Sequence, residues 1–282
     1  MAFINFNGKL IEENQPIVDA NSRGLRFGDG LFETLKYKNG HLVLIDEHLA
    51  RLWNGMKAFQ FDIPKLMTPD KLESEIIALV KKNKLSAARI RMTVFRGHGG
   101  LFDPQNHTPS YLLQASALPE TNGDWNENGL HLCIYKDARK SADAFSSFKH
   151  NNFLPYLMGA LFAKKEKCND ALILNNNHFI CDSTIANVFM IKDGSIFTPP
   201  LHDGCIAGIM RSFVIQWLQE HQFDIKEKTI SENELLEADE IFLTNSIYNI
   251  RWASAIAQQP LRCTISRQIF NAIKQTNPDV FC

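Results

Sequence analysis

Two Asn-Gly dipeptides place the strongest constraint on how this chain of 282 residues can fold. Asn7-Gly8 separates residues 3–6 from residues 9–11, and Asn39-Gly40 separates residues 33–38 from residues 41–44. Both central positions of a two-residue hairpin turn need positive φ, which Asn and Gly tolerate better than other residues. The chain is therefore predicted to begin with antiparallel hairpins.

Apolar periodicity predicts the remaining elements. Residues repeat at helical spacing over 49–59, 72–80, 154–161, 210–218 and 265–273. Short alternating or apolar runs predict strands at 89–96, 111–115, 171–174, 178–181, 187–191, 195–197 and 240–243. Asp46, Thr68 and Ser231 are the predicted helix caps, because each stands just before a helical pattern.

A polar stretch without periodicity divides the chain. We predict an N-terminal domain at 1–118, a linker at 119–128 and a C-terminal domain at 129–282. Strands and helices are mixed in both halves, and no repeat is present. The predicted fold class is α+β, with a mainly antiparallel or barrel-like sheet and flanking helices in each domain.

Composition excludes several classes of function. The formal net charge of -1 offers no basic field for nucleic acid or anionic lipid. No apolar run approaches the roughly 20 residues that span a bilayer, and the N-terminus does not resemble a signal peptide. The six cysteines are scattered, without metal spacing, which favours a reducing cytoplasm and no metal site.

Six segments carry residue types suited to a phosphorylated ligand or to catalysis. They are Asn21–Thr34, Glu47–Leu52, Phe148–Pro155, Cys181–Phe189, Ala207–Arg211 and Leu243–Ser246. In the first segment, Gly28 and Gly30 allow a backbone course that a Cβ atom would block. In the fifth, free backbone N–H groups at the start of a predicted helix favour a phosphate.

Two cations in these segments suit specific roles. The planar guanidinium of Arg51 can contact two phosphate oxygens at once. A lysine that attacks a carbonyl must be partly neutral, and apolar surroundings such as Phe148 and Phe153 favour this at Lys149. Taken alone, Arg51 or Lys149 is equally consistent with an exposed surface side chain. The functional interpretation therefore depends on the order in which the six segments occur along the chain.

Together, from Asp19 to Ser246, these segments resemble the fold-type IV enzymes that use pyridoxal 5′-phosphate (PLP), the class IV aminotransferases. The family includes branched-chain aminotransferases, D-amino-acid aminotransferases and 4-amino-4-deoxychorismate lyase. The resemblance implies an N-terminal α/β sandwich, a C-terminal barrel-like PLP-binding domain and a homodimer. It also implies small amino and oxo acids as substrates.

The resemblance also implies roles for individual residues. Lys149 is the implied catalytic residue, which forms the bond to PLP. The implied cofactor-binding residues are Arg51, Lys149, Asp182, Gly208, Ile209, Thr244 and Asn245. The implied substrate-binding residues are Phe32, Thr34, Arg96 and His98.

The sequence departs from the family pattern at Asp182, where the family has Glu beside the pyridine nitrogen. Asp is one methylene shorter, so the ring must shift, the backbone must approach, or a water must bridge. We expect an aminotransferase that moves an amino group between an amino acid and a 2-oxo acid. The alternatives are 4-amino-4-deoxychorismate lyase, releasing pyruvate and 4-aminobenzoate, and a protein that binds PLP without turnover.

Overall fold

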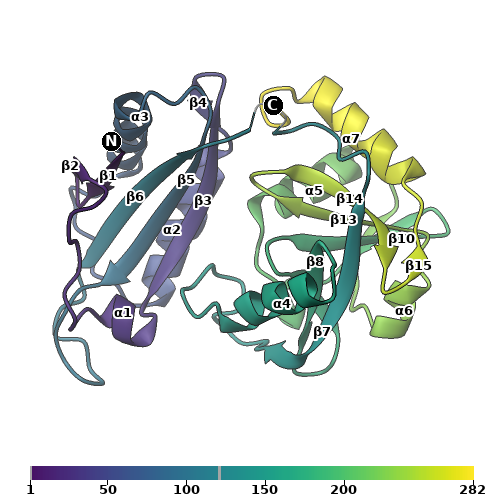
Figure 1. Cartoon of the computed structure of the whole chain (residues 1–282), viewed down its shortest axis with the longest axis horizontal. Helices are drawn as coiled ribbons and strands as arrows, with labels where there is room; N and C mark the ends of the chain where they lie inside the picture. Colours follow the sequence, from purple (N-terminus) through teal and green to yellow (C-terminus); the bar gives the residue numbers. More distant parts are fainter. Residues whose placement is uncertain (1, 120–121) are drawn as a thin grey trace. The chain divides into compact units, whose positions relative to one another are not determined.

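The computed structural model describes residues 2–119 and 122–282, which divide into two compact units (Figure 1). Unit 1 is Met1–Asn122 with Phe148–Asn152, and unit 2 is Gly123–Ser147 with Phe153–Cys282. The chain passes between the units inside the predicted linker 119–128, of which residues 120 and 121 lie outside the described residues. The predicted C-terminal domain included residues 148–152, but these residues pack with unit 1.

Unit 1 is built on one six-stranded sheet with the order β2-β1-β6-β5-β3-β4. All of its strand pairs are antiparallel. The strands are β1 (Phe3–Phe6), β2 (Lys9–Glu12), β3 (Gly30–Lys38), β4 (His41–Leu42), β5 (Ala88–Arg96) and β6 (Pro109–Ala117). The helices are α1 (Arg23–Phe27), α2 (Ile45–Ala58) and α3 (Pro69–Lys82).

The local signals in unit 1 explain most of these boundaries. Asn7 and Gly8 have φ of 50° and 86°, and Asn39 and Gly40 have 52° and 87°, so both predicted hairpin turns are confirmed. Thr68 caps α3 by accepting a hydrogen bond from the backbone N–H of Lys71 at 3.3 Å, as predicted.

The predicted cap of α2 was wrong. Leu44, in a left-handed conformation with φ of 52°, immediately precedes α2, and Asp46 lies inside its first turn. No side chain caps this helix end. The carboxylate of Asp46 still suits its position, because negative charge is favourable near the N-terminus of a helix.

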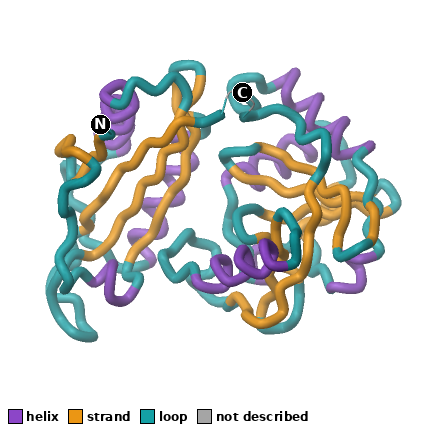
Figure 2. The backbone as a smooth tube through the Cα atoms, viewed as in Figure 1, coloured by secondary structure: helices purple, strands orange, loops and turns teal. Residues whose placement is uncertain are grey.

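One face of the unit 1 sheet carries the core, where α2 and α3 pack on β3, β5 and β6 (Figure 2). Leu52 and Met56 of α2 and Leu79 of α3 are almost wholly buried there. Side chains alternate along a strand, so Phe32 and Thr34 of β3 point to the opposite face from Leu31 and Leu35. Two residues of the predicted site therefore lie on the face of the sheet that the helices leave open.

The edge of β3 is covered by a segment that is distant in the sequence. The backbone N–H of Phe32 donates to the carbonyl of Lys149 at 2.8 Å, and that of Asn151 donates to the carbonyl of Gly30 at 2.9 Å. β4 pairs only with the other end of β3, at Tyr37 and Lys38. Residues 148–152 therefore continue the sheet, which explains why they belong to unit 1.

Unit 2 contains a nine-stranded sheet with the order β12-β11-β10-β13-β14-β7-β8-β9, and β15 is paired to β14. A further pairing of β9 with β10 closes the strands β10, β13, β14, β7, β8 and β9 into a barrel. The strands are β7 (Leu130–Lys140), β8 (Asp170–Asn175), β9 (Ile180–Ser183), β10 (Asn187–Lys192), β11 (Ser195–Thr198), β12 (Ile225–Glu227), β13 (Glu240–Asn245), β14 (Asn249–Ile256) and β15 (Gln259–Pro260). The helices are α4 (Leu154–Lys165), α5 (Ile209–Glu220), α6 (Glu232–Leu236) and α7 (Thr264–Thr276), with a 3-10 turn at Leu201–Asp203.

Most strand pairs of unit 2 are antiparallel, and apolar side chains such as Leu172, Val188 and Leu243 form a buried core among the barrel strands. Ser231 and Glu234 form the predicted capping box of α6. The predicted fold class is confirmed: the chain is α+β, with two mainly antiparallel sheets and flanking helices.

Gly30 holds the strand β3 against two neighbours, and we predict that Gly30→Ala destabilises unit 1. A Cβ atom there would lie 2.3 Å from the Val94 carbonyl oxygen and 2.6 Å from Asn151 Nδ2. Such overpacking costs roughly 1–3 kcal/mol, measurable by urea denaturation. Gly97→Ala is the control, because its nearest neighbour, Ser110 Oγ, is 4.0 Å away. Equal stability of the two variants would contradict the tight packing of residues 148–152 on β3.

Candidate functional site

Lys149 lies on the open face of the unit 1 sheet. Its Nζ is 4.8 Å from the centre of the Phe32 ring, and the guanidinium of Arg91 is 3.9 Å from the same centre. Lys149 is half-buried, and its neighbour Phe148 packs on the opposite side, against the core formed with α2. The pairing of residues 148–152 with β3 therefore sets Lys149 beside Phe32.

Arg51 is held by a buried carboxylate. Glu33, which is 1% exposed, accepts hydrogen bonds from Arg51 Nε at 2.8 Å and from Arg51 Nη2 at 2.6 Å. His48 Nδ1 lies 2.7 Å from the same carboxylate, and His48 Nε2 is buried without a hydrogen-bond partner among the described residues. The two-point contact with Glu33 fixes the plane of the Arg51 guanidinium and uses its Nε and Nη2 donors.

The electrostatics of this group favour a charged carboxylate beside a neutral imidazole. Burial raises the pKa of Glu33, but the positive charge of Arg51 and hydrogen bonds from His48 and Arg51 outweigh it and lower the pKa to about 2. Burial lowers the pKa of His48 below its ordinary value of 6.5, although the hydrogen bond with Glu33 acts in the opposite direction.

The structure gives two of the predicted substrate-binding residues other contacts. Arg96 forms an ion pair with Asp29 and donates to the carbonyl oxygens of Phe59 and Gln60, so its guanidinium holds the Gly-rich segment to the sheet. His98 is exposed at the surface, with Nδ1 3.2 Å from Asp19 Oδ2. Their roles in substrate binding stay predictions, and the local geometry of Arg96 favours a structural role.

In unit 2, Asp182 is 2% exposed and lies at the pairing that closes the barrel, opposite Asn187. Asn187 Nδ2 donates to Asp182 Oδ1 at 2.8 Å and also reaches the Ile206 carbonyl at 2.8 Å. The backbone N–H of Ile206 donates to Asp182 Oδ2 at 3.0 Å. These bonds connect Asp182 to the chain that enters α5.

The N-terminus of α5 has the features of an anion site. Gly208 precedes the helix, and a Cβ there would lie 1.9 Å from Asn187 Oδ1, so only glycine fits. No side chain caps this end, and the first-turn N–H groups of Ile209 and Met210 have no hydrogen-bond partner among the described residues. Thr244 pairs with Asn187 across the sheet, and its buried Oγ1 likewise lacks a partner in the described part of the chain.

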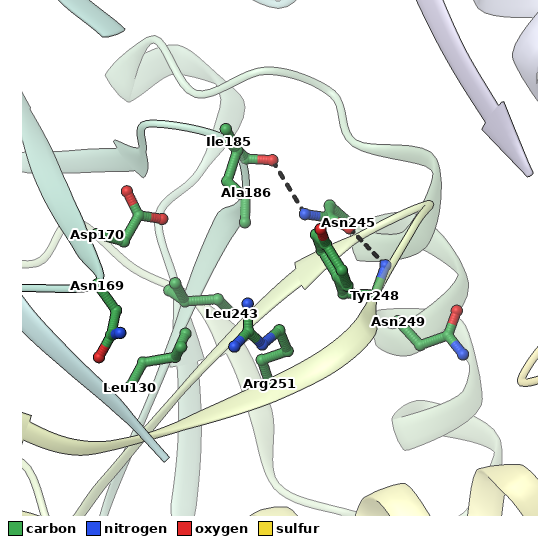
Figure 3. Close-up of a pocket in the computed structure, with 10 residues that line it drawn as sticks. All are labelled: Leu130, Asn169, Asp170, Ile185, Ala186, Leu243, Asn245, Tyr248, Asn249 and Arg251. Carbon is green, nitrogen blue, oxygen red and sulfur yellow. Dashed lines mark hydrogen bonds between the residues drawn. The ribbon is translucent and has the colours of Figure 1, made fainter. Parts of the chain in front are cut away.

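Asn245 lines a pocket in unit 2 where β13 turns into β14 (Figure 3). Its Nδ2 donates to the Ile185 carbonyl at 3.3 Å, and its Oδ1 accepts from the backbone N–H of Tyr248 at 2.8 Å. The amide therefore closes the turn between β13 and β14. Its predicted contact with a cofactor is not needed to explain its position.

Several residues around these groups were not selected by sequence reasoning. Lys140 and Tyr156 both contact Asp182, and Glu33 and His48 orient Arg51. Arg91 has no carboxylate within ion-pair distance among the described residues, although it is half-buried. In the predicted strand 89–96, Arg89 and Arg91 alternate with apolar residues, and this alternation is the sequence feature that indicates the position of Arg91.

We predict that the stability of the protein falls with acid in two stages. The folded pKa of His48 is lowered, so its contribution is complete above pH 6.5 and is lost as the pH falls below that value. The pKa of Glu33 is lowered from 4.5 to about 2, so its contribution, on the order of 3 kcal/mol, is lost between those values. Urea denaturation at successive pH values measures both stages.

The variant Glu33→Gln should lose roughly 3–5 kcal/mol at neutral pH, because it breaks a buried ion pair. It should also lack the stage below pH 4.5. Glu47→Gln is the control, because Glu47 is an exposed carboxylate on α2, the helix that carries His48 and Arg51. A stage below pH 4.5 that persists unchanged in Glu33→Gln would show that another carboxylate causes it.

Comparison with known proteins assigns the chain to a family. The family Amino-transferase class IV matches residues 30–256. A Methanocaldococcus jannaschii protein that provisionally carries the name branched-chain-amino-acid aminotransferase is 29% identical over 250 residues, covering 88% of this chain and 85% of the relative. D-alanine aminotransferase of Bacillus licheniformis is 28% identical over 263 residues, 91% of this chain and 89% of the relative. Aminodeoxychorismate lyase of Vibrio harveyi is 27% identical over 245 residues, 86% of this chain and 89% of the relative.

A solved structure has the same fold. A T.th. branched-chain amino acid aminotransferase, solved with pyridoxamine 5′-phosphate, superposes with a TM-score of 0.87 at 21% identity, covering 96% of this chain and 92% of that one. Among the described residues, no helix is long and apolar enough to span a membrane. Nor do the described histidine, cysteine and acidic side chains form a group that could hold a metal ion. The match over residues 30–256 shows that the chain belongs to the class IV aminotransferase family.

Proposed function

We propose that this protein is a PLP-dependent aminotransferase that moves an amino group between an amino acid and a 2-oxo acid. The observation that carries the proposal is the position of Lys149, half-buried over the ring of Phe32 and fixed to β3 through its backbone. A lysine so placed is partly desolvated, which favours the neutral amine that attacks a carbonyl.

The residues present fit PLP. Thr244 Oγ1 is a buried donor without a partner among the described residues, and the start of α5 offers the N–H groups of Ile209 and Met210. Both features suit the phosphate group, as does the oriented guanidinium of Arg51. Asp182 Oδ1 accepts one hydrogen bond, from Asn187, and so retains room for the N–H of a pyridine ring.

We assign the chemical roles accordingly. Bound PLP supplies a ring that withdraws electrons from the substrate Cα. Lys149 Nζ would hold the cofactor at its aldehyde carbon, and the same amine would serve as the general base that accepts the substrate Cα proton. Arg51, Gly208, Ile209 and Thr244 would hold the phosphate, and Asp182 would pair with the ring nitrogen. Asn245 stays a proposed cofactor-binding residue, although its side chain already closes a turn.

For the substrate, we propose that Phe32 and Thr34 contact the side chain and that Arg91 faces a carboxylate. Burial lowers the pKa of Arg91 and so does the neighbouring charge of Arg89, and among the described residues the guanidinium has the Phe32 ring but no carboxylate beside it. A bound carboxylate would compensate the charge of this cation. Arg96 and His98 stay weaker candidates because of the contacts described above.

A lyase that releases pyruvate from 4-amino-4-deoxychorismate is the second candidate function. It is favoured by the Vibrio harveyi relative and by the segments Lys149–Pro155 and Phe242–Ser246, which are close to lyase-type sequences. Binding of PLP without turnover is a third candidate, motivated by Asp182 in place of the family Glu.

The first test of the function is reduction of the protein with borohydride after addition of PLP, followed by peptide mapping. We predict a stable adduct on Lys149 and its complete loss in Lys149→Ala, with Lys164→Ala as the control. An adduct that survives in Lys149→Ala would refute the assignment. Assays with amino and oxo acid pairs and with aminodeoxychorismate then separate transferase, lyase and inactive binder.

We also propose that the protein is a homodimer whose contact surface includes α4. Leu154, Leu157 and Leu161 are 66%, 55% and 61% exposed and lie on one side of this helix. Their helical spacing makes a continuous apolar stripe, which monomeric proteins rarely leave exposed. A second copy is the occupant that the family resemblance favours. We keep a cytoplasmic location as a proposal too, on the basis of the six free cysteines.

Light scattering tests the assembly. We predict a dimer for the unaltered protein and mostly monomer for the double variant Leu157→Glu, Leu161→Glu, because charges would then occupy an apolar contact. Leu66→Glu is the control, since Leu66 is 80% exposed and belongs to unit 1, whereas α4 belongs to unit 2. A dimer that survives the α4 substitutions would place the contact elsewhere.

A further inference from the structure

Asp182 receives more donors than a surface carboxylate. Lys140 Nζ lies 3.1 Å from Oδ2, the Tyr156 hydroxyl donates to Oδ2 at 2.8 Å, and the backbone N–H of Ile206 adds a third bond at 3.0 Å. Asn187 donates to Oδ1. Lys140 and Tyr156 are themselves 6% and 4% exposed, so the whole network is buried in unit 2.

The distribution of these bonds leaves one oxygen available. A carboxylate has about four acceptor positions, two on each oxygen. Oδ2 accepts from three donors, which is more than its two acceptor positions, whereas Oδ1 accepts from one donor. The acceptor position that remains is therefore on Oδ1.

Tyr156 acts as a donor in this network. Burial, together with the negative charge of Asp182, raises the pKa of Tyr156 well above its ordinary value, so the phenol stays protonated. Lys140 Nζ also lies 5.4 Å from the centre of the Tyr156 ring, so its positive charge is close to both Asp182 and Tyr156. Rotation of Asp182 would break the contacts with Lys140, Tyr156 and Ile206 together.

The other titratable groups that act on this network are two thiols. Cys181 precedes Asp182 on β9, and Cys205 lies in the segment before α5. Burial raises the pKa of Cys181 above its ordinary value and raises that of Cys205 to about 12. Both thiols are therefore neutral, and Lys140 is the one cation that faces Asp182 among the described residues.

We propose that Lys140 and Tyr156 are positioning residues that hold the short Asp182 side chain with Oδ1 directed at the pyridine nitrogen of PLP. The charge of Lys140 also partly offsets that of Asp182 at this nitrogen. This proposal rests on the proposed function. It accounts for the departure from Glu, because a longer side chain would displace the donors from β7 and α4.

The experiment measures cofactor binding and the pH dependence of the visible absorbance band of the PLP-loaded protein. Tyr156→Phe removes one hydrogen bond to Asp182, and we expect the PLP dissociation constant to rise about fivefold to tenfold. Lys140→Met removes a positive charge near the cofactor, which favours its protonated form. The pH midpoint of the band should therefore rise by about half a unit to one unit.

Matched controls come from β7, the strand that carries Lys140. Tyr135→Phe removes a hydroxyl from a buried tyrosine of this strand, and Lys136→Met removes an exposed lysine that pairs with Glu232. Both should match the unaltered protein in dissociation constant and midpoint. Lys140→Arg keeps the charge and should restore the midpoint, which also covers the case in which Lys140→Met fails to fold.

The outcomes separate the two proposals. Unaltered protein that shows no cofactor band overturns the proposed function and this inference with it. A normal band with Tyr156→Phe and Lys140→Met equal to their controls overturns the inference alone. A lower melting temperature with unchanged dissociation constant and midpoint also overturns it, because a purely structural role predicts that result.

Discussion

The backbone pairing of residues 148–152 with β3 is the constraint on which the arrangement of unit 1 depends. The chain leaves unit 1 after Asn122 and returns for only five residues, Phe148–Asn152. Two backbone hydrogen bonds and the exclusion of any side chain at Gly30 fix that return. Because side chains alternate along an extended segment, Phe148 packs into the core and Lys149 meets Phe32 on the open face. Lys149 is thus positioned by the sheet itself.

Both units hold a buried acid by surrounding it with donors. Glu33 is compensated by Arg51 and His48, and Asp182 by Lys140, Tyr156 and backbone or amide N–H groups. A buried charge is costly unless it is paired and hydrogen-bonded. The two networks differ in purpose: Glu33 fixes the orientation of a neighbouring cation, whereas Asp182 is itself fixed and keeps one acceptor position. In both, the partners come from different elements, so the orientation depends on the folded unit.

Sequence patterns predicted the hairpins, most strands and the cap of α3, because those features depend on a few adjacent residues. They failed at the start of α2, where the left-handed conformation of Leu44 replaces a side-chain cap. They could not place residues 148–152 in unit 1, because strand pairing over more than a hundred positions leaves no local signal. The partners of Asp182 were missed for the same reason, since Lys140 and Tyr156 lie 42 and 26 positions away in the sequence.

The choice between transferase and lyase depends on what faces the substrate beyond the Cα atom. In the proposed mechanism both reactions begin with loss of the Cα proton to Lys149, so the proposed cofactor-binding residues do not separate them. Arg91 is more informative, because burial and the charge of Arg89 both disfavour its cation where it stands. A branched aliphatic side chain would offer no interaction that offsets the unfavourable burial of the Arg91 cation. A substrate that brings an additional carboxylate to this face would offset it, and both a dicarboxylic amino acid and aminodeoxychorismate meet that requirement.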